Sequence, residues 1–221
     1  MSDYIIVIVL AAIIATVYYK LFFKEKIAQM IYEDADGWRF GPIIKGETRS
    51  KGMPFSEIDV AKGFTIPKRA DGHVNELTTD VPAIVGQLAA GKTIEIVVEI
   101  EGDEDAQFFQ KENDVADATM TPFFRVDNVN WYVNLPEDME NADRWYGLGG
   151  RTPMTIGRHT ITLPLSQDRW INVWGQNLPS FYEALKRAER FGLVFGGNFG
   201  LAHGVYTDRA VTLKIVSVKI V

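Results

Sequence analysis

The sequence predicts a mostly β protein, an antiparallel β-sandwich of the jelly-roll type with one short helix, preceded by one N-terminal transmembrane α-helix. Three observations predict this class. The chain opens with an uncharged apolar run, many short segments after residue 72 alternate in hydrophobicity, and one segment near residue 180 has helical periodicity. We therefore expect a membrane anchor over residues 1–26, a connecting segment over 27–71 and a sandwich domain over 72–221.

The expected anchor rests on residues 4–19, which carry no charged side chain and are followed by Lys20 and three more apolar residues. About 20 helical residues, rising ~1.5 Å each, span the ~30 Å core of a bilayer. Tyr4, Tyr18 and Tyr19 lie where aromatic side chains meet the headgroups, and Lys20 can extend its ammonium to the same level. A cleaved signal peptide is the alternative, but no basic residue precedes the run and no small-residue cleavage site follows it. The lipid bilayer is thus an expected partner.

The charges that flank this run predict its orientation. Lys20, Lys24 and Lys26 follow it, whereas the preceding tail carries Asp3 and no basic side chain. The excess of basic residues on the cytoplasmic side of membrane helices then places the C-terminal domain in the cytoplasm. We expect a single-pass membrane protein.

The connecting segment is rich in Gly, Pro and charged residues and shows no sustained period. Trp38, Phe40 and Ile43 are the side chains expected to attach it to the domain, with at most one short strand.

Strand patterns dominate the domain because apolar and polar residues alternate or β-branched residues cluster. Residues with this pattern are 93–100, 122–133, 159–165, 170–174, 191–195 and 210–221. In the last segment, Val211, Leu213 and Ile215 share one parity, whereas Val218 and Ile220 share the other. A strand that buries one face cannot change parity without an extra residue, so we predict a β-bulge at 216–217.

One helix is predicted after Pro179. Ser180 and Glu183 have the spacing of a capping box, an apolar stripe follows, and Gly192 supplies a stop signal. The stripe consists of Phe181, Ala184, Leu185 and Ala188.

Composition excludes several classes of function. The net charge is -6, which disfavours sequence-independent binding of nucleic acid, because phosphate neutralisation needs clustered Lys and Arg. The chain has no cysteine, which rules out disulfides, thiol nucleophiles and cysteine-based metal sites.

A resemblance adds to this interpretation. The segments 157–166, 170–175, 192–197 and 200–206, with 73–79 and 94–103 before them, resemble a family of bacterial β-sandwich proteins. That family is similar to carbohydrate-binding modules with the galactose-binding-like jelly-roll fold. The resemblance covers residues 72–221 and implies a non-catalytic sandwich with a glycan as a ligand.

The aromatic residues are the first candidates for that ligand site, since sugar C–H faces stack on aromatic rings. Trp170 and Trp174 are expected to be mainly buried. Trp145 and Tyr146, beside Asp143 and Arg144 in a glycine-flanked polar stretch, are expected to be exposed. Candidate ligand-binding residues are therefore Asp143, Arg144, Trp145, Tyr146, His203 and Tyr206.

Two other patterns have simpler interpretations. Residues 86–93 satisfy the phosphate-loop pattern, but a strand rather than a helix follows, so we expect a turn before a strand. Glu101, Asp103 and Asp105 are candidate ligands of a structural calcium ion, against the alternative of a solvated acidic loop. No histidine pair has metal-ligand spacing. No cofactor other than this calcium is expected.

Two functions fit these observations. The first is a non-enzymatic, membrane-anchored binding module of carbohydrate-binding type. The second is an accessory or structural subunit of a larger membrane protein complex, such as a bioenergetic or photosynthetic complex or the membrane of a virion, with other membrane proteins as partners. An enzyme is the least supported, because no nucleophile elbow or assignable carboxylate pair appears in the sequence.

Overall fold

The computed structural model describes residues 37–44, 47–126, 143–198 and 200–221. The expected membrane anchor, with Tyr4, Tyr18, Tyr19 and Lys20, lies outside these residues, as do residues 127–133 of the predicted strand 122–133. Within the described part of the chain, no helix has the length and apolarity needed to span a membrane. Asp36–Val221 form one compact unit. Residues 36–71, which the sequence assigns to a connecting segment, therefore belong to the domain.

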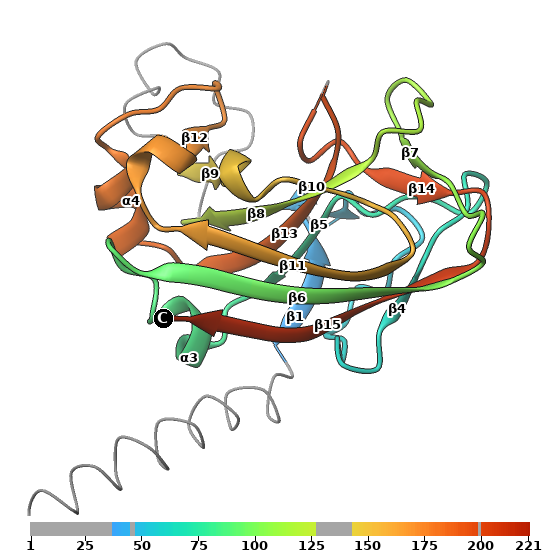
Figure 1. The fold of residues 1–221 in the computed structure, drawn as a ribbon, viewed down its shortest axis with the longest axis horizontal. Helices are drawn as coiled ribbons and strands as arrows, with labels where there is room; N and C mark the ends of the chain where they lie inside the picture. The colour runs from blue at the N-terminus through green and yellow to red at the C-terminus, as the bar shows by residue number, and fades with distance from the viewer. Residues whose placement is uncertain (1–36, 45–46, 127–142, 199) are drawn as a thin grey trace, which may run out of the picture. The chain divides into compact units, whose positions relative to one another are not determined.

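The domain consists mostly of antiparallel β-sheets in a sandwich-like arrangement with few helices (Figure 1). The larger sheet has seven strands in the order β1-β5-β13-β8-β9-β12, and β10 pairs with β8 beside this path. Its strands are β1 (Trp38–Gly41), β5 (Glu76–Thr79), β8 (Thr119–Arg125), β9 (Arg144–Tyr146), β10 (Thr152–Pro153), β12 (Ile171–Asn172) and β13 (Arg190–Gly196).

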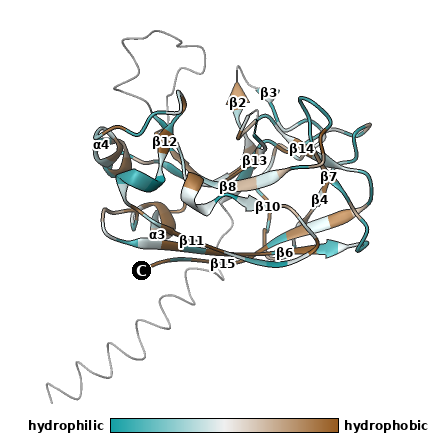
Figure 2. Cartoon of the chain, turned by 45° about the horizontal axis from the view of Figure 1, so that its top comes forward, coloured by the Kyte–Doolittle hydropathy of each residue, from teal (hydrophilic) through white to brown (hydrophobic). Residues whose placement is uncertain are grey.

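The smaller main sheet has four strands in the order β11-β6-β15-β4. Figure 2 separates the two layers, with β11, β6 and β15 in the lower one and β8 and β13 in the upper one. The strands are β4 (Phe64–Ile66), β6 (Thr93–Gly102), β11 (Gly157–Pro164) and β15 (Val211–Ile220).

Short elements complete the described fold. Two strand pairs stand apart from the main sheets, and the helices are all of six residues or fewer. The strands are β2 (Ile43–Ile44) with β3 (Glu47–Thr48), and β7 (Phe108–Gln110) with β14 (Val205–Thr207). The helices are α3 (Pro82–Val85), the 3-10 helices η3 (Leu148–Gly150) and η4 (Gln167–Arg169), and α4 (Phe181–Lys186).

The four-stranded sheet follows the alternation of its sequence. Ile94, Ile96, Val98 and Ile100 of β6 are buried, because a strand presents every second side chain to the core. The register of β15 on β6 shifts between Ile215 and Ser217, which confirms the predicted β-bulge. The extra residue lets Val211, Leu213 and Ile215 before the bulge and Val218 after it all be buried.

The described residues between 37 and 71 contribute one strand to each layer. β1 forms an edge of the seven-stranded sheet through β5, and β4 forms an edge of the four-stranded sheet through β15. Phe40 of β1 packs edge-to-face on Phe64 of β4, with ring centroids 4.8 Å apart. This contact ties the two sheets together, and its distance is typical of a favourable aromatic pair.

An aromatic cluster closes one end of the sandwich. Phe124 and Trp145 are directly opposite each other on β8 and β9, so they face the same side of the sheet. Phe181 of α4 lies 5.8 Å from Phe124, 5.4 Å from Trp145 and 5.8 Å from Trp170 between ring centroids. All four rings have 0 % exposure. Ala184 and Leu185 of the helix are buried as well, so three of the four residues of the predicted apolar stripe face the core, and Ala188, after the helix, is partly buried.

The helix itself is shorter than the sequence predicts, and its capping box is absent. Ser180 precedes α4 in an α-helical conformation, and its buried hydroxyl makes no hydrogen bond among the described residues. Glu183 pairs with Lys186 instead. The expected stop at Gly192 is also wrong, because Arg190–Gly196 pairs with β5 and β8 as strand β13.

The phosphate-loop pattern lies in a turn before a strand, as predicted. Gly91 has φ +80, which glycine adopts without strain, and β6 begins two residues later. A helix N-terminus that could meet phosphate groups does not follow.

Candidate functional site

A groove of about 570 Å³ lies on the face of the seven-stranded sheet that points away from the aromatic cluster. Its volume falls in the range of ~300–1,000 Å³ that is usual for small-ligand sites. Six separate parts of the chain line it: the segment around β2 and β3, Asn75 before β5, the residues after β7, strand β9, strand β12 with the turn after it, and the loop before β14. The lining residues are Pro42, Ile44, Arg49, Asn75, Lys111, Glu112, Arg144, Tyr146, Ile171, Asn172, Val173, Gly175, Gly200, Leu201, Ala202 and His203.

Tyr146 joins the groove to the sheet beneath it. It is opposite Phe123 of β8 and Ile171 of β12, so the three side chains share one face. Tyr146, Phe123 and Val194 form a buried cluster against which the groove residues Ile171 and Leu201 pack. The groove therefore has an apolar floor fixed to three paired strands.

Trp145 and Tyr146 are not an exposed loop pair, contrary to the expectation from the sequence. Trp145 is 0 % and Tyr146 is 7 % exposed, because Arg144–Tyr146 form β9 between β8 and β12. Alternation along the strand sends the two rings to opposite faces, with Trp145 in the aromatic cluster and Tyr146 under the groove. Trp170 is buried as expected, whereas Trp174 is only partly buried in the turn after β12.

The loop that carries His203 is held close to the sheet by glycines. Gly204 has φ +105, and a Cβ there would lie 2.8 Å from the imidazole of His73. A Cβ on Gly200 would lie 2.3 Å from the ring of His203. The carbonyl of Ala202 accepts a hydrogen bond of 2.9 Å from Nδ2 of Asn75. Glycine therefore allows the approach that places His203 at the groove.

The side chain of Asn75 holds an unused hydrogen-bond acceptor. The residue is 7 % exposed, and its side-chain oxygen accepts no hydrogen bond from the described residues. A buried amide oxygen without a donor is costly, by about 1–3 kcal/mol. This oxygen is itself buried beneath the groove, beside Gly204.

The charged side chains at the groove are mostly cationic. Arg49, Lys111 and Arg144 line it, and Glu112 is the one carboxylate among its lining residues. Nδ1 of His203 lies 3.1 Å from Oε1 of Glu112, with about half of each side chain exposed. The positive charge on the lining contrasts with the net charge of -6 of the chain.

A buried carboxylate lies in the same sheet beside this site. Glu76 of β5 is 1 % exposed, accepts a 3.1 Å hydrogen bond from the Thr78 hydroxyl and lies 3.4 Å from Nε of Arg125. Burial raises the pKa of Glu76, and the positive charge of Arg125 opposes that shift. Burial also raises the pKa of Tyr146 to about 12, with Arg144 lowering it and Glu76 raising it. The Tyr146 phenol therefore keeps its proton at neutral pH.

Tyr206 belongs to a neighbouring cavity. Its hydroxyl donates a 2.6 Å hydrogen bond to Oδ1 of Asp114, and its ring stacks on Phe109 at 5.3 Å. Burial, followed by the bond to Asp114, raises the pKa of Tyr206 to about 12. The adjoining cavity of about 240 Å³ is lined by Lys51, Arg69, Gly72, His73, Lys111, Asp114 and Tyr206. Lys111 lines both spaces, so the groove and this cavity are neighbours.

The structure thus brings three of the six candidate ligand residues together at the groove, namely Arg144, Tyr146 and His203. Asp143 is not among its lining residues and pairs with Arg187 at 3.0 Å. The groove residues that sequence reasoning missed are Arg49, Asn75, Lys111 and Glu112. They come from distant parts of the chain, and no spacing in the sequence relates them.

The acidic residues expected to hold calcium are not assembled into a metal site. Glu101 pairs with Lys214 at 2.7 Å, and Asp103 pairs with Arg209. The amide of Asp105 donates to Asp103, a bond that, together with Arg209, lowers the pKa of Asp103. Across the described ranges, no group of three or more acidic or histidine side chains could hold a metal ion.

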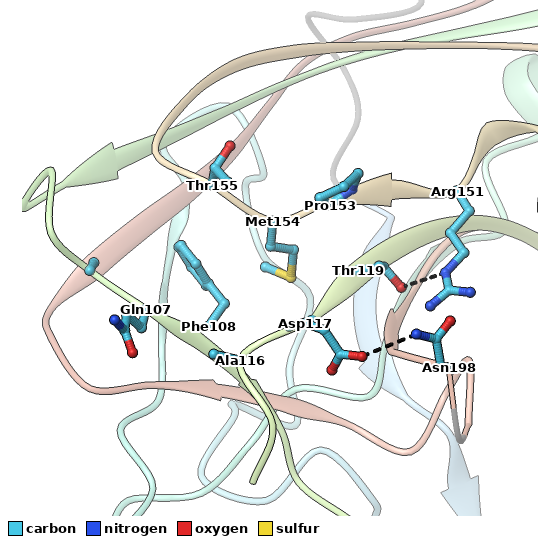
Figure 3. Close-up of a pocket in the computed structure, with 12 residues that line it drawn as sticks. Gln107, Phe108, Ala116, Asp117, Thr119, Arg151, Pro153, Met154, Thr155 and Asn198 are labelled. Atoms are coloured by element: carbon cyan, nitrogen blue, oxygen red, sulfur yellow. Dashed lines mark hydrogen bonds between the residues drawn. The ribbon is translucent and has the colours of Figure 1, made fainter. Parts of the chain in front are cut away.

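A second cavity of about 580 Å³ lies near β7, β8 and β10 and contains none of the candidate residues. Figure 3 shows its polar pairs, in which Arg151 donates to the Thr119 hydroxyl at 3.1 Å and Asn198 donates to Asp117 at 3.2 Å. These polar side chains therefore form hydrogen bonds with one another. This cavity is therefore a weaker candidate than the groove that holds Asn75.

Comparison of the chain with protein-family models, with curated proteins and with solved structures gives no significant match.

Proposed function

We propose that the chain is a non-enzymatic binding module of carbohydrate-binding type, held at a membrane by an N-terminal helix, with the groove over β9 and β12 as its ligand site. The membrane helix rests on the apolar run of residues 4–23, and the lysines after it favour a cytoplasmic domain. The jelly-roll class of the sandwich rests on the resemblance of residues 72–221.

The observation that carries the proposal is the combination of surfaces at the groove. The partly buried side chains Ile171 and Leu201 offer apolar contact, while the half-exposed side chains of Glu112 and His203 offer polar contact. A sugar ring presents both an apolar C–H face and hydroxyl donors, so these two features match one ligand. An apolar floor beside exposed polar side chains is the arrangement that saccharide recognition needs.

The carboxylates at the groove favour binding over hydrolysis. Glycoside hydrolysis ordinarily uses two carboxyl groups on either side of the scissile bond. Glu112 is the one carboxylate among the residues that line the groove, and it lies beside His203. We therefore assign the lining to ligand recognition.

Binding by the intact chain tests this proposal. The full-length protein is purified in a detergent without a sugar headgroup, because alkyl glycosides would compete for the groove. Isothermal titration against a panel of neutral and acidic oligosaccharides should give saturable binding. Absence of binding across the panel, together with copurification in a stable complex of membrane proteins, would favour the accessory-subunit alternative.

A matched pair of variants locates the site. Ala202 lines the groove and Ala116 lines the second cavity, so each alanine-to-phenylalanine change fills one space. We expect Ala202→Phe to weaken binding at least about tenfold, or ~1.4 kcal/mol, and Ala116→Phe to leave it unchanged. The opposite pattern would move the site to the second cavity.

A further inference from the structure

The second cavity, near β7, β8 and β10, holds two opposite charges that do not pair with each other. Arg151 and Asp117 are the only charged side chains among the described residues that line it, and no ion pair within the described part of the chain joins them. Both residues are only partly buried, which keeps them within reach of a ligand. The lining therefore presents one positive and one negative group and carries no net charge.

A buried threonine fixes the orientation of the guanidinium. The hydroxyl of Thr119, a residue only 7 % exposed, accepts a 3.1 Å hydrogen bond from Nε of Arg151 and donates one of 3.4 Å to the carbonyl of Gly196. The two terminal nitrogens of Arg151 make no hydrogen bond or ion pair with the described residues. A guanidinium held in this way can bind a carboxylate through two parallel hydrogen bonds.

Neutral amides hold the carboxylate of Asp117. Its Oδ1 accepts from the side-chain amide of Gln110, and its Oδ2 accepts a 3.2 Å hydrogen bond from Nδ2 of Asn198 (Figure 3). These donors orient the carboxylate without cancelling its charge, and they fill two of its about four acceptor positions. Asp117 lies two residues before Thr119, so its Cα is within about 7 Å of the Cα of the residue that holds Arg151. The two charges therefore suit a small ligand that carries both opposite charges.

The rest of the lining offers apolar contact. Phe108 and Met154 are each 4 % exposed and line the cavity together with Ala118 and Pro153. In Figure 3 the side chains of Phe108 and Met154 lie to the left of the charged groups. Apolar walls beside a few oriented polar groups are typical of small-molecule sites.

We infer that this cavity binds the zwitterion of a free α-amino acid with an apolar side chain. Arg151 binds the carboxylate and Asp117 the ammonium, two groups that share one carbon in such a ligand. Phe108 and Met154 contact its side chain. A lining without net charge favours a zwitterion, because each charge of the ligand meets its opposite. A simple carboxylate would leave Asp117 unmatched, and a simple amine would leave Arg151 unmatched. This site shares no lining residue with the groove and does not depend on the proposed function.

The test removes one charge of the ligand at a time. The full-length protein, in the same detergent, is titrated calorimetrically with phenylalanine, leucine and methionine. Each is compared with its N-acetyl derivative, which lacks the ammonium, and with its methyl ester, which lacks the carboxylate. We expect at least one free amino acid to bind about tenfold or more tightly than either of its derivatives, because each derivative loses hydrogen bonds between charged groups.

Two pairs of variants with equal changes in charge assign the contacts. Arg151→Gln should weaken binding of the amino acid about tenfold and leave binding of the methyl ester unchanged. Asp117→Asn should weaken binding of the amino acid similarly and leave binding of the N-acetyl derivative no weaker. Arg169→Gln and Asp168→Asn are the controls, because these residues of η4 pair with each other at 3.2 Å and line neither the groove nor this cavity. We expect them to change none of these affinities.

The outcomes are independent of the saccharide titrations. If none of the amino acids binds, or if a derivative binds as tightly as the free amino acid, the inference is overturned and the groove is unaffected. These comparisons use the unchanged chain, so they decide the question even if Asp117→Asn lowers stability. Ala116→Phe should abolish binding of the amino acid and Ala202→Phe should not; the reverse would place the amino acid in the groove and overturn the assignment.

Discussion

Truncation of Phe181 should be among the most destabilising changes in the domain. Its ring is fully buried and lies within 6 Å of the rings of Phe124, Trp145 and Trp170. Phe181→Ala removes this ring from between partners on paired strands, so the cavity left behind cannot easily close. Such substitutions cost about 3–5 kcal/mol. Because these three ring pairs and a fourth with Tyr182 are lost, each worth ~0.5–1.5 kcal/mol beyond burial, we expect the upper half of that range.

Phe55→Ala is the matched control, since the side chain of Phe55 is 59 % exposed. Surface truncations of this kind usually stay within about 0.5 kcal/mol. Thermal unfolding of the full-length chain, followed by near-ultraviolet circular dichroism, should show a fall in Tm of about 8–20 °C for Phe181→Ala and almost none for Phe55→Ala. A difference below ~1 kcal/mol between the two variants would refute the central position of Phe181.

Two further changes test the backbone and the buried charge near the groove. Gly204→Ala should lower the free energy of unfolding by ~1–3 kcal/mol because of the positive φ, and by more because the new Cβ would clash with His73. Gly91 also has a positive φ but open space around it, so the Gly204→Ala variant should unfold at a lower denaturant concentration than the Gly91→Ala variant. Equal losses of stability in the two variants would contradict the clash. Burial raises the pKa of Glu76 in the folded protein above the ordinary value of 4.5, so the folded state favours the protonated carboxyl. The stability that this group contributes is fully present below pH 4.5 and is lost as the pH rises through the raised pKa. The stability of Glu76→Gln relative to the wild-type chain should therefore increase with pH over that window, and parallel pH profiles in urea denaturation would argue against the shift.

Patterns along single strands could be predicted from the sequence. The alternation in 93–100 and 159–165 predicts β6 and β11, because one face of each strand meets the core and the other meets water. The parity change after Ile215 predicts the bulge for the same reason. These features depend on residues close together in the chain, where a period is visible.

Features that depend on pairing between distant segments could not be predicted. Arg144–Tyr146 has a glycine after it and charges before it, so the sequence resembles a loop, and only its position between β8 and β12 buries Trp145. The same limit applies to the groove, since Asn75 and Lys111 meet only after the sheet has formed. The side-chain oxygen of Asn75 lacks a hydrogen-bond donor because of how distant segments pack, and no pattern in the neighbouring sequence indicates it.

The position of β15 has a consequence for how the domain folds. This strand lies between β6 and β4, yet its residues 211–220 are synthesised after all the other strands described above. Until it arrives, both neighbours expose unpaired backbone groups that other chains could bind. Contacts between such distant segments also slow folding, to about milliseconds or seconds in all-β domains. The four-stranded sheet can therefore be completed only after residues 211–220 have been synthesised.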